Sequence, residues 1–184
     1  VLSDLLRGQL GSEPEMSHGA EAGATAVLLD EALMPISISP AHTGLDLNYR
    51  ITPAGDVPGS ANTVTTTLAC TGLGARPLSP VHLRIEPDVD GLGLTWIRRS
   101  RLEGDSWEIP DPPLDADSER YRVSVLDEQE TVLRQWEVAA PAASYSDADR
   151  LTDTGSLQET VIFEVAQLAS SGRAGPPARS VFTP

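Results

Sequence analysis

The strongest constraint on the fold is a series of short runs in residues 76–184, in which apolar and polar residues alternate. Such alternation is typical of a strand with one face on a core and the other in solvent. Clusters of Gly, Pro and Asp separate the runs. The apolar positions of four runs are Val81, Leu83 and Ile85; Leu92, Leu94 and Trp96; Tyr121, Val123 and Val125; and Val161, Phe163 and Val165. We therefore predict half-buried antiparallel strands.

The spacing of these runs indicates one domain over residues 76–184. About seven strands in about 100 residues is the size of an immunoglobulin-like sandwich, and we expect a fibronectin type III-like β-sandwich. Aromatic residues make up only 4% of the chain, so each Trp is expected to anchor the core. Trp96 lies in phase with its run, and Trp136 is assigned to the core because it aligns with Val132 and Val138.

Residues 1–75 are predicted to form a smaller β-rich domain, so that the fold class is all-β throughout. Its strand candidates are residues 27–29, 36–38, 45–51 and 64–70. A unit this short buries a small fraction of its surface. We expect it to be completed by residues upstream in a longer protein or by another chain. The linker is residues 71–77, which contain two Gly and a Pro.

The charge of the chain disfavours one class of partner. The formal net charge is -14, and all basic residues are Arg. A surface this negative repels phosphate backbones, so direct nucleic-acid binding is not expected. No apolar run reaches the roughly 18 residues of a membrane-spanning helix, so we predict no transmembrane segment.

Cofactor, metal and catalytic signatures are weak, and we predict no cofactor and no enzymatic activity for this chain. Cys70 is the single cysteine; we predict that it is buried on one strand face with Val64, Thr66 and Leu68. The three histidines are scattered in the sequence. The segment 88–91 (Asp-Val-Asp-Gly) resembles the start of a calcium loop but lacks the later oxygen ligands. It is predicted to be a hairpin turn instead.

The long connection in residues 98–120 is the candidate binding surface, because long loops on rigid scaffolds often carry function. Arginines beside an aromatic ring can grip a partner carboxylate or an anionic sugar. The candidate residues are Arg98, Arg99, Arg101 and Trp107. The alternative is that these arginines pair with acids of the same connection while the Trp covers the open end of the core. Those acids are Glu103, Asp105 and Glu108.

A family resemblance adds to this interpretation. Its motifs, in chain order, are Leu5-Leu6-Arg7-Gly8-Gln9-Leu10-Gly11-Ser12-Glu13, His18-Gly19, Val27-Leu28-Leu29-Asp30, Arg76-Pro77-Leu78-Ser79-Pro80-Val81-His82-Leu83-Arg84, Leu94-Thr95-Trp96-Ile97-Arg98-Arg99, Gly104-Asp105-Ser106-Trp107, Val165-Ala166-Gln167-Leu168 and Gly175-Pro176-Pro177-Ala178. Taken in this order, they resemble the C-terminal part of the tail-hub proteins of siphophages and of phage-like gene transfer agents of alphaproteobacteria.

The resemblance implies a virion component at the distal tail tip, as a baseplate hub or central fibre. It implies a homotrimer around the tail axis, contacts with other tail proteins, and a role in host attachment or in envelope penetration and DNA delivery. A host cell-surface glycan or receptor is a further implied partner. The hydrolase-like barrel of the family has no counterpart in these residues. The alternative function is an accessory carbohydrate-binding or spacer domain of a secreted bacterial glycoside hydrolase. A third possibility is an enzyme with an unrecognised pair of acids.

Overall fold

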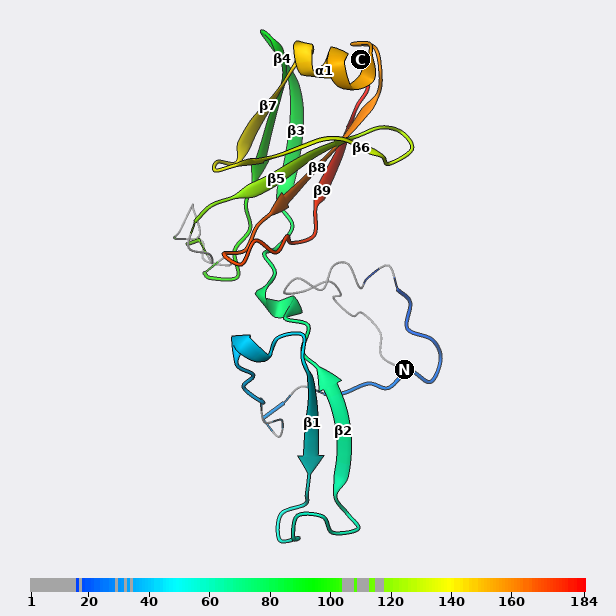
Figure 1. Ribbon diagram of the computed structural model, residues 1–184, viewed down its shortest axis with the longest axis vertical. Coiled ribbons are helices and arrows are strands. Elements are labelled where there is room, and N and C mark those ends of the chain that lie inside the picture. The colour runs from blue at the N-terminus through cyan, green and yellow to red at the C-terminus, as the bar shows by residue number, and fades with distance from the viewer. Residues whose placement is uncertain are drawn as a thin grey trace. The chain divides into compact units, whose positions relative to one another are not determined.

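The computed structural model describes residues 16, 18–28, 30–31, 33, 35–103, 108, 113–114 and 118–184. The chain divides into two compact units, with Gly19–Ala75 in one and Arg76–Pro184 in the other, to which the described residues Met16 and His18 are also assigned (Figure 1). Within the described residues, no helix is long and apolar enough to cross a membrane.

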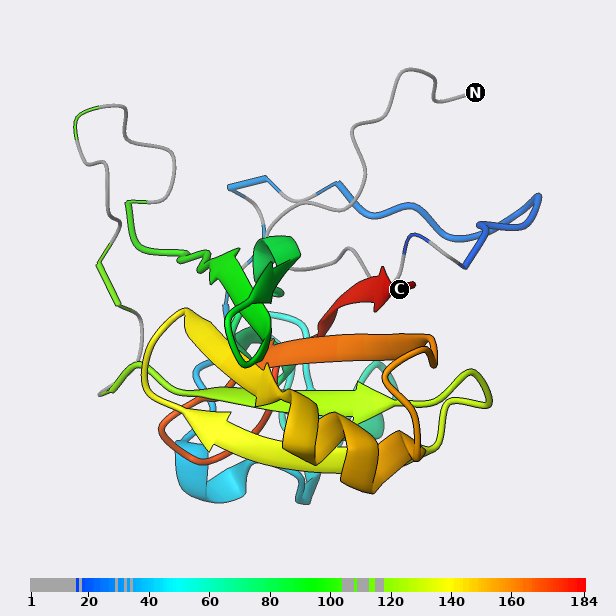
Figure 2. The same cartoon turned by 90° about the horizontal axis from the view of Figure 1, so that it is seen from above.

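The second unit is a sandwich of two antiparallel sheets (Figures 1 and 2). The three-stranded sheet has the order β3-β4-β7, formed by Val81–Asp88, Gly91–Ile97 and Ala142–Ser146. The four-stranded sheet has the order β6-β5-β8-β9, formed by Val132–Val138, Tyr121–Leu126, Val161–Gln167 and Ala178–Phe182. The fourth strand of the sandwich, β6, pairs with β5 and does not join the first sheet. This pairing distinguishes a fibronectin type III-like sandwich from the immunoglobulin constant arrangement.

The core confirms the alternation seen in the sequence. The inward residues of β4, β5 and β8 are buried: Leu92, Leu94, Trp96, Tyr121, Val123, Val125, Val161, Phe163 and Val165. Leu83 and Ile85 of β3 are half-buried and pack against them. Trp96 meets Tyr121 edge to face, with ring centroids 5.1 Å apart. Each such aromatic pair adds about 1 kcal/mol beyond the area that it buries.

The prediction of which β6 residues point into the core is partly wrong. Trp136 is half-buried and packs against the core, where it stacks on Tyr145 with ring centroids 6.2 Å apart. Val132, however, is 52% exposed. The register between β5 and β6 shifts after Val125, so that Leu133 becomes an extra residue in β6. A bulge of this kind reverses the inward and outward positions beyond it, and Leu133 packs against the core instead.

A short helix, α1 (Asp147–Thr154), follows β7 and contacts β4, β6 and β7, so it closes one end of the sandwich between the two sheets (Figure 2). This helix was not predicted from the sequence. Ser146 caps its start, since the Ser146 side chain accepts a hydrogen bond from the backbone N–H of Asp149 at 3.1 Å. Gly155 ends it in the left-handed conformation, with φ of 77°. The Ser-x-x-Asp capping pattern at residues 146–149 was the signal available in the sequence.

The first unit is a two-stranded antiparallel ribbon, β1 (Asp46–Ile51) with β2 (Val64–Ala69), flanked by 3₁₀ turns at Pro40–His42 and Leu73–Ala75. These two strands were predicted. The predicted strands at residues 27–29 and 36–38 are wrong for the described residues, which are irregular there; Leu29 lies outside the described part. Two apolar residues in alternation, between Pro35 and Pro40, are too few to hold a strand without a partner.

Cys70 also departs from its prediction. It is half-buried and follows the end of β2, where its backbone carbonyl accepts a hydrogen bond from the Gly44 N–H at 2.8 Å. Val64 and Leu68, which were expected to share a buried face with it, are each 59% exposed. Val64 and Leu68 do lie on one face of β2, but the described residues of this unit leave both side chains largely exposed.

Candidate functional site

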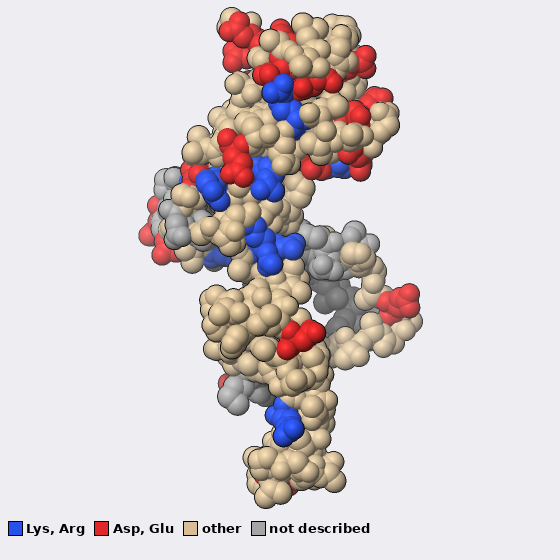
Figure 3. Space-filling model, in the orientation of Figure 1, with Lys and Arg blue, Asp and Glu red and all other residues tan. Residues whose placement is uncertain are grey.

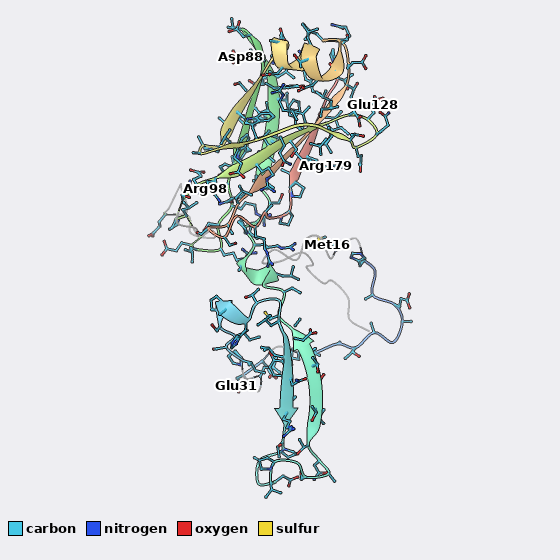
Figure 4. The ribbon with its side chains drawn as sticks, viewed as in Figure 1. Met16, Glu31, Asp88, Arg98, Glu128 and Arg179 are labelled. Carbon is cyan, nitrogen blue, oxygen red and sulfur yellow. The ribbon has the colours of Figure 1, made fainter. Side chains whose placement is uncertain are left out.

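The candidate arginines lie where β4 ends and the long connection to β5 begins (Figure 4). Arg98, Arg99 and Arg101 are all half-buried. Trp107, the aromatic member of the predicted site, lies outside the described residues. The position of the arginines is therefore set by the end of β4.

Arg98 joins the two ends of the connection. Its guanidinium forms an ion pair with Glu119 at 3.6 Å, with side chains 16% and 23% exposed. The Tyr121 hydroxyl donates a hydrogen bond of 2.6 Å to the same carboxylate. Burial, together with this hydrogen bond, raises the pKa of Tyr121 above its ordinary value. Arg98, Glu119 and Tyr121 thus tie the end of β4 to the start of β5.

Arg101 is also engaged in structure. Its Nη1 donates a hydrogen bond of 2.6 Å to the backbone carbonyl of Arg76, a few residues before β3. A guanidinium that grips a partner carboxylate must offer its two parallel N–H groups to that partner. In this arrangement Arg98 and Arg101 hold the base of the connection, through Glu119 and through the Arg76 carbonyl.

Gln167, at the end of β8, lies close to this region and was missed by the sequence analysis. It pairs with Tyr121 in the β5–β8 ladder and its side chain is 0% exposed. Neither atom of its side-chain amide has a hydrogen-bond partner among the described residues. A buried amide without partners costs about 1–3 kcal/mol. The alternation in the sequence could have predicted that this side chain is buried, because Gln167 continues the inward series of Val161, Phe163 and Val165.

The opposite end of the sandwich holds a denser polar cluster around Asp153 of α1. Arg134 of β6 donates two hydrogen bonds to this carboxylate, at 2.6 Å from Nε and 3.1 Å from Nη2. The Tyr145 hydroxyl donates a third at 2.9 Å. Arg134 Nη2 also lies 2.9 Å from Asp149. These contacts attach α1 to β6 and β7.

The hydrogen bonds from Arg134 hold the pKa of Asp153 below its ordinary value, and burial raises that of Tyr145. Perturbed groups of this kind often mark catalytic sites, but ion-pair networks within a fold produce them too. Here the Asp153 side chain is only 10% exposed, and its three hydrogen bonds all come from the sandwich itself. The cluster is therefore best explained as structural.

Two further arginines hold strand β9 in place. Arg150 of α1 is 7% exposed; it donates to Asp147 at 3.0 Å and to the Leu157 carbonyl at 2.8 Å, and its guanidinium lies 5.3 Å from the centre of the Phe182 ring. Arg179, on the exposed side of β9, donates to Glu164 at 2.7 Å (Figure 4). In both cases the arginine side chain interacts with residues of its own domain.

The predicted hairpin turn between β3 and β4 is confirmed. Asp88 pairs with Gly91, so Val89 and Asp90 form a two-residue turn. A Cβ atom placed on Gly91 would lie 2.3 Å from the Tyr145 carbonyl oxygen, which explains the glycine by the close approach of β7. Among the residues that the structure describes, no group of three or more His, Cys, Asp or Glu is placed to hold a metal ion.

Comparison with known proteins adds a distant likeness. No protein-family model matches the chain, and no curated protein matches it. Among solved structures, the chain is similar to the crystal structure of the rat CD45 extracellular region, domains d3-d4, with 10% sequence identity and a TM-score of 0.41 over 87% of this chain and 75% of that chain. The fold assignment therefore rests on the strand order and core of the chain itself.

Proposed function

We propose that this chain is a structural component of the tail tip of a phage or gene transfer agent, acting as part of a baseplate hub or central fibre. The ordered motifs of the sequence support this proposal. The observation that carries it is the contrast between the two units. One is a sandwich in which several arginines pair with acids of the same domain, and the other is a ribbon with no buried residue in its described part.

The sandwich suits the role of a stiff spacer. At one end, α1 bridges the two sheets and is fixed to them by Arg134 of β6 and by the contact of Arg150 with the Phe182 ring of β9. At the other end, Arg98 and Arg101 hold the base of the β4–β5 connection. Domains with both ends fixed transmit force and position without large internal motion, which is what an arm at a tail tip requires.

The ribbon suits a part that is completed by assembly. An isolated two-stranded hairpin is marginally stable in water, and it gains stability when a third strand or another element covers its apolar face. Other tail proteins and other copies of this chain are the partners in this proposal. The net charge of -14 keeps assembled particles apart and limits contact with anionic cell surfaces before a specific contact forms.

Immunogold labelling of purified particles tests the proposal. An antibody against the 184-residue chain is expected to label one end of the tail, and deletion of these residues from the gene is expected to give particles without that label. A chain found in the culture medium and never on particles, with affinity for a polysaccharide, would instead support the accessory carbohydrate-binding domain. Measurable hydrolysis of peptidoglycan by the purified chain would support the enzyme.

A further inference from the structure

An open hollow lies on the outer face of the three-stranded sheet, where β3 pairs with β4. Its volume is about 360 Å³, which is within the range of small-ligand sites. Leu83 packs against the core, so its neighbours His82 and Arg84 lie on the outer face of the sheet. The residues that line the hollow are His82, Arg84, Thr95, Trp96 and Ile97.

The backbone of β3 is irregular beside this hollow. Two residues of β3, His82 and Leu83, stand opposite the single residue Trp96 of β4, which makes a bulge. His82 also has φ of 54°, a left-handed conformation that costs a non-glycine residue about 1–2 kcal/mol. Bulges and strained residues are concentrated next to functional sites, where they direct a side chain. Here the bulge lets His82 and Arg84 line the same hollow.

The hollow is basic in a chain that is acidic overall. None of the described residues that line it is an acid, whereas the net charge of the chain is -14. Figure 3 shows acidic side chains over much of the visible face of the sandwich. Glu86, the next acid along β3, lies opposite Gly93 and does not line the hollow. The hollow therefore favours an anion over a neutral or cationic ligand.

Arg84 is available to such an anion. Its exposed side chain has no hydrogen bond or ion pair with any residue that the structure describes. Several other arginines of the sandwich, in contrast, pair with its acids: Arg98, Arg134, Arg150 and Arg179. A guanidinium offers two parallel N–H groups that match the two oxygens of a carboxylate. The imidazole of His82 and the hydroxyl of Thr95 supply further donors in the same hollow.

We propose that this hollow binds a carboxylate group, with Arg84 holding both carboxylate oxygens and with His82 and Thr95 donating further hydrogen bonds. Arg84 is a permanent cation in an otherwise acidic chain, which suits a ligand with one negative charge better than a phosphate with two. Ile97, which is 57% exposed, provides an apolar contact for the carbon atoms of the ligand. A small organic acid and a uronic acid unit of a polysaccharide both have this chemistry. The inference goes beyond the proposed function and does not depend on it.

Titration of the isotopically labelled 184-residue chain with sodium glucuronate, followed by NMR, tests the site. The backbone amide signals of His82, Arg84 and Thr95 are expected to shift, with a dissociation constant of about 1–10 mM. Glucose lacks the carboxylate and is expected to leave these signals unchanged. No shift with glucuronate up to about 50 mM, or an equal shift with glucose, overturns the inference. Propionate identifies the source: equal affinity for propionate indicates small organic acids, and tighter binding of glucuronate indicates a uronic acid unit.

Two variants and a matched control locate the contact. Arg84→Gln removes the cation and is expected to weaken glucuronate binding about fivefold. His82→Gly removes the imidazole at a position whose φ suits glycine, so the fold is kept, and binding is expected to weaken about threefold. Arg122→Gln removes an arginine of the other sheet, paired with Glu137, and is expected to change binding less than about twofold. Equal weakening by Arg84→Gln and Arg122→Gln would mean that net charge controls binding, and would overturn the inference.

Discussion

Replacing Asp153 with Asn removes the charge that attaches α1 to the sandwich while keeping the shape of the side chain. Asp153 accepts two hydrogen bonds from Arg134 and one from Tyr145. A hydrogen bond to a charged group contributes about 1.5–3 kcal/mol. Arg134 keeps its contact with Asp149 and is 34% exposed, so water replaces part of the loss. We expect Asp153→Asn to lower the free energy of unfolding by about 2 kcal/mol.

Urea unfolding of the full chain at pH 7, followed by tryptophan fluorescence, measures this change, because Trp96 and Trp136 lie in the same sandwich. With an unfolding entropy of about 2.1 cal/mol/K per residue and a sandwich of about 110 residues, the same loss lowers the melting temperature by about 9 °C. Glu137→Gln is the matched control. It also removes one negative charge, but its pairs with Arg120 and Arg122 lie at the surface, at 3.9 and 3.4 Å. Exposed pairs contribute less than about 1 kcal/mol.

The pH dependence gives an independent check. Because the pKa of Asp153 is lower in the folded chain than in the unfolded one, its contribution is complete above the unfolded value and is lost as the pH falls through the folded value. The difference between the wild-type chain and Asp153→Asn is therefore expected to be constant from about pH 5 to 7 and to shrink below about pH 4. A difference under about 0.5 kcal/mol at pH 7, or one that grows in acid, would refute the role assigned to this carboxylate.

Substitutions at three other sites, with controls, test local features by the same unfolding measurement. Gly91→Ala is expected to destabilise the chain by about 3 kcal/mol, because the added Cβ would lie 2.3 Å from a backbone oxygen. Gly93→Ala is the control: the nearest atom to its added Cβ lies 3.8 Å away, so stability is expected to change by less than about 1 kcal/mol. Similar losses from the two substitutions would contradict the close approach of β7 to Gly91. His82 has φ of 54°, so His82→Gly is expected to be more stable than His82→Ala by about 1 kcal/mol, and the reverse order would refute a left-handed residue there. Gln167→Leu is expected to leave stability equal or raise it by about 1 kcal/mol, since the buried amide has no partner among the described residues; a loss above about 2 kcal/mol would show that the amide is bonded.

The sequence predicted those parts of the fold in which one face of a strand is buried. Leu92, Leu94 and Trp96 alternate because β4 has a core on one side only, and the same reasoning locates β5 and β8. It failed for Val132, because one extra residue in β6 reverses the phase without changing the composition of the run. It also failed at residues 36–38, where alternation was present but no partner strand was available.

The candidate site was predictable in its position but not in its contacts. Sequence placed Arg98 at the start of a long connection, yet its partner Glu119 lies at the other end of that connection. The two meet because β4 ends and β5 begins at the same end of the sandwich, which is a property of the strand order. In the same way, Arg134 and Asp153 are 19 residues apart and are joined only when α1 folds against β6. Pairings of this kind depend on the tertiary structure, and local patterns cannot specify them.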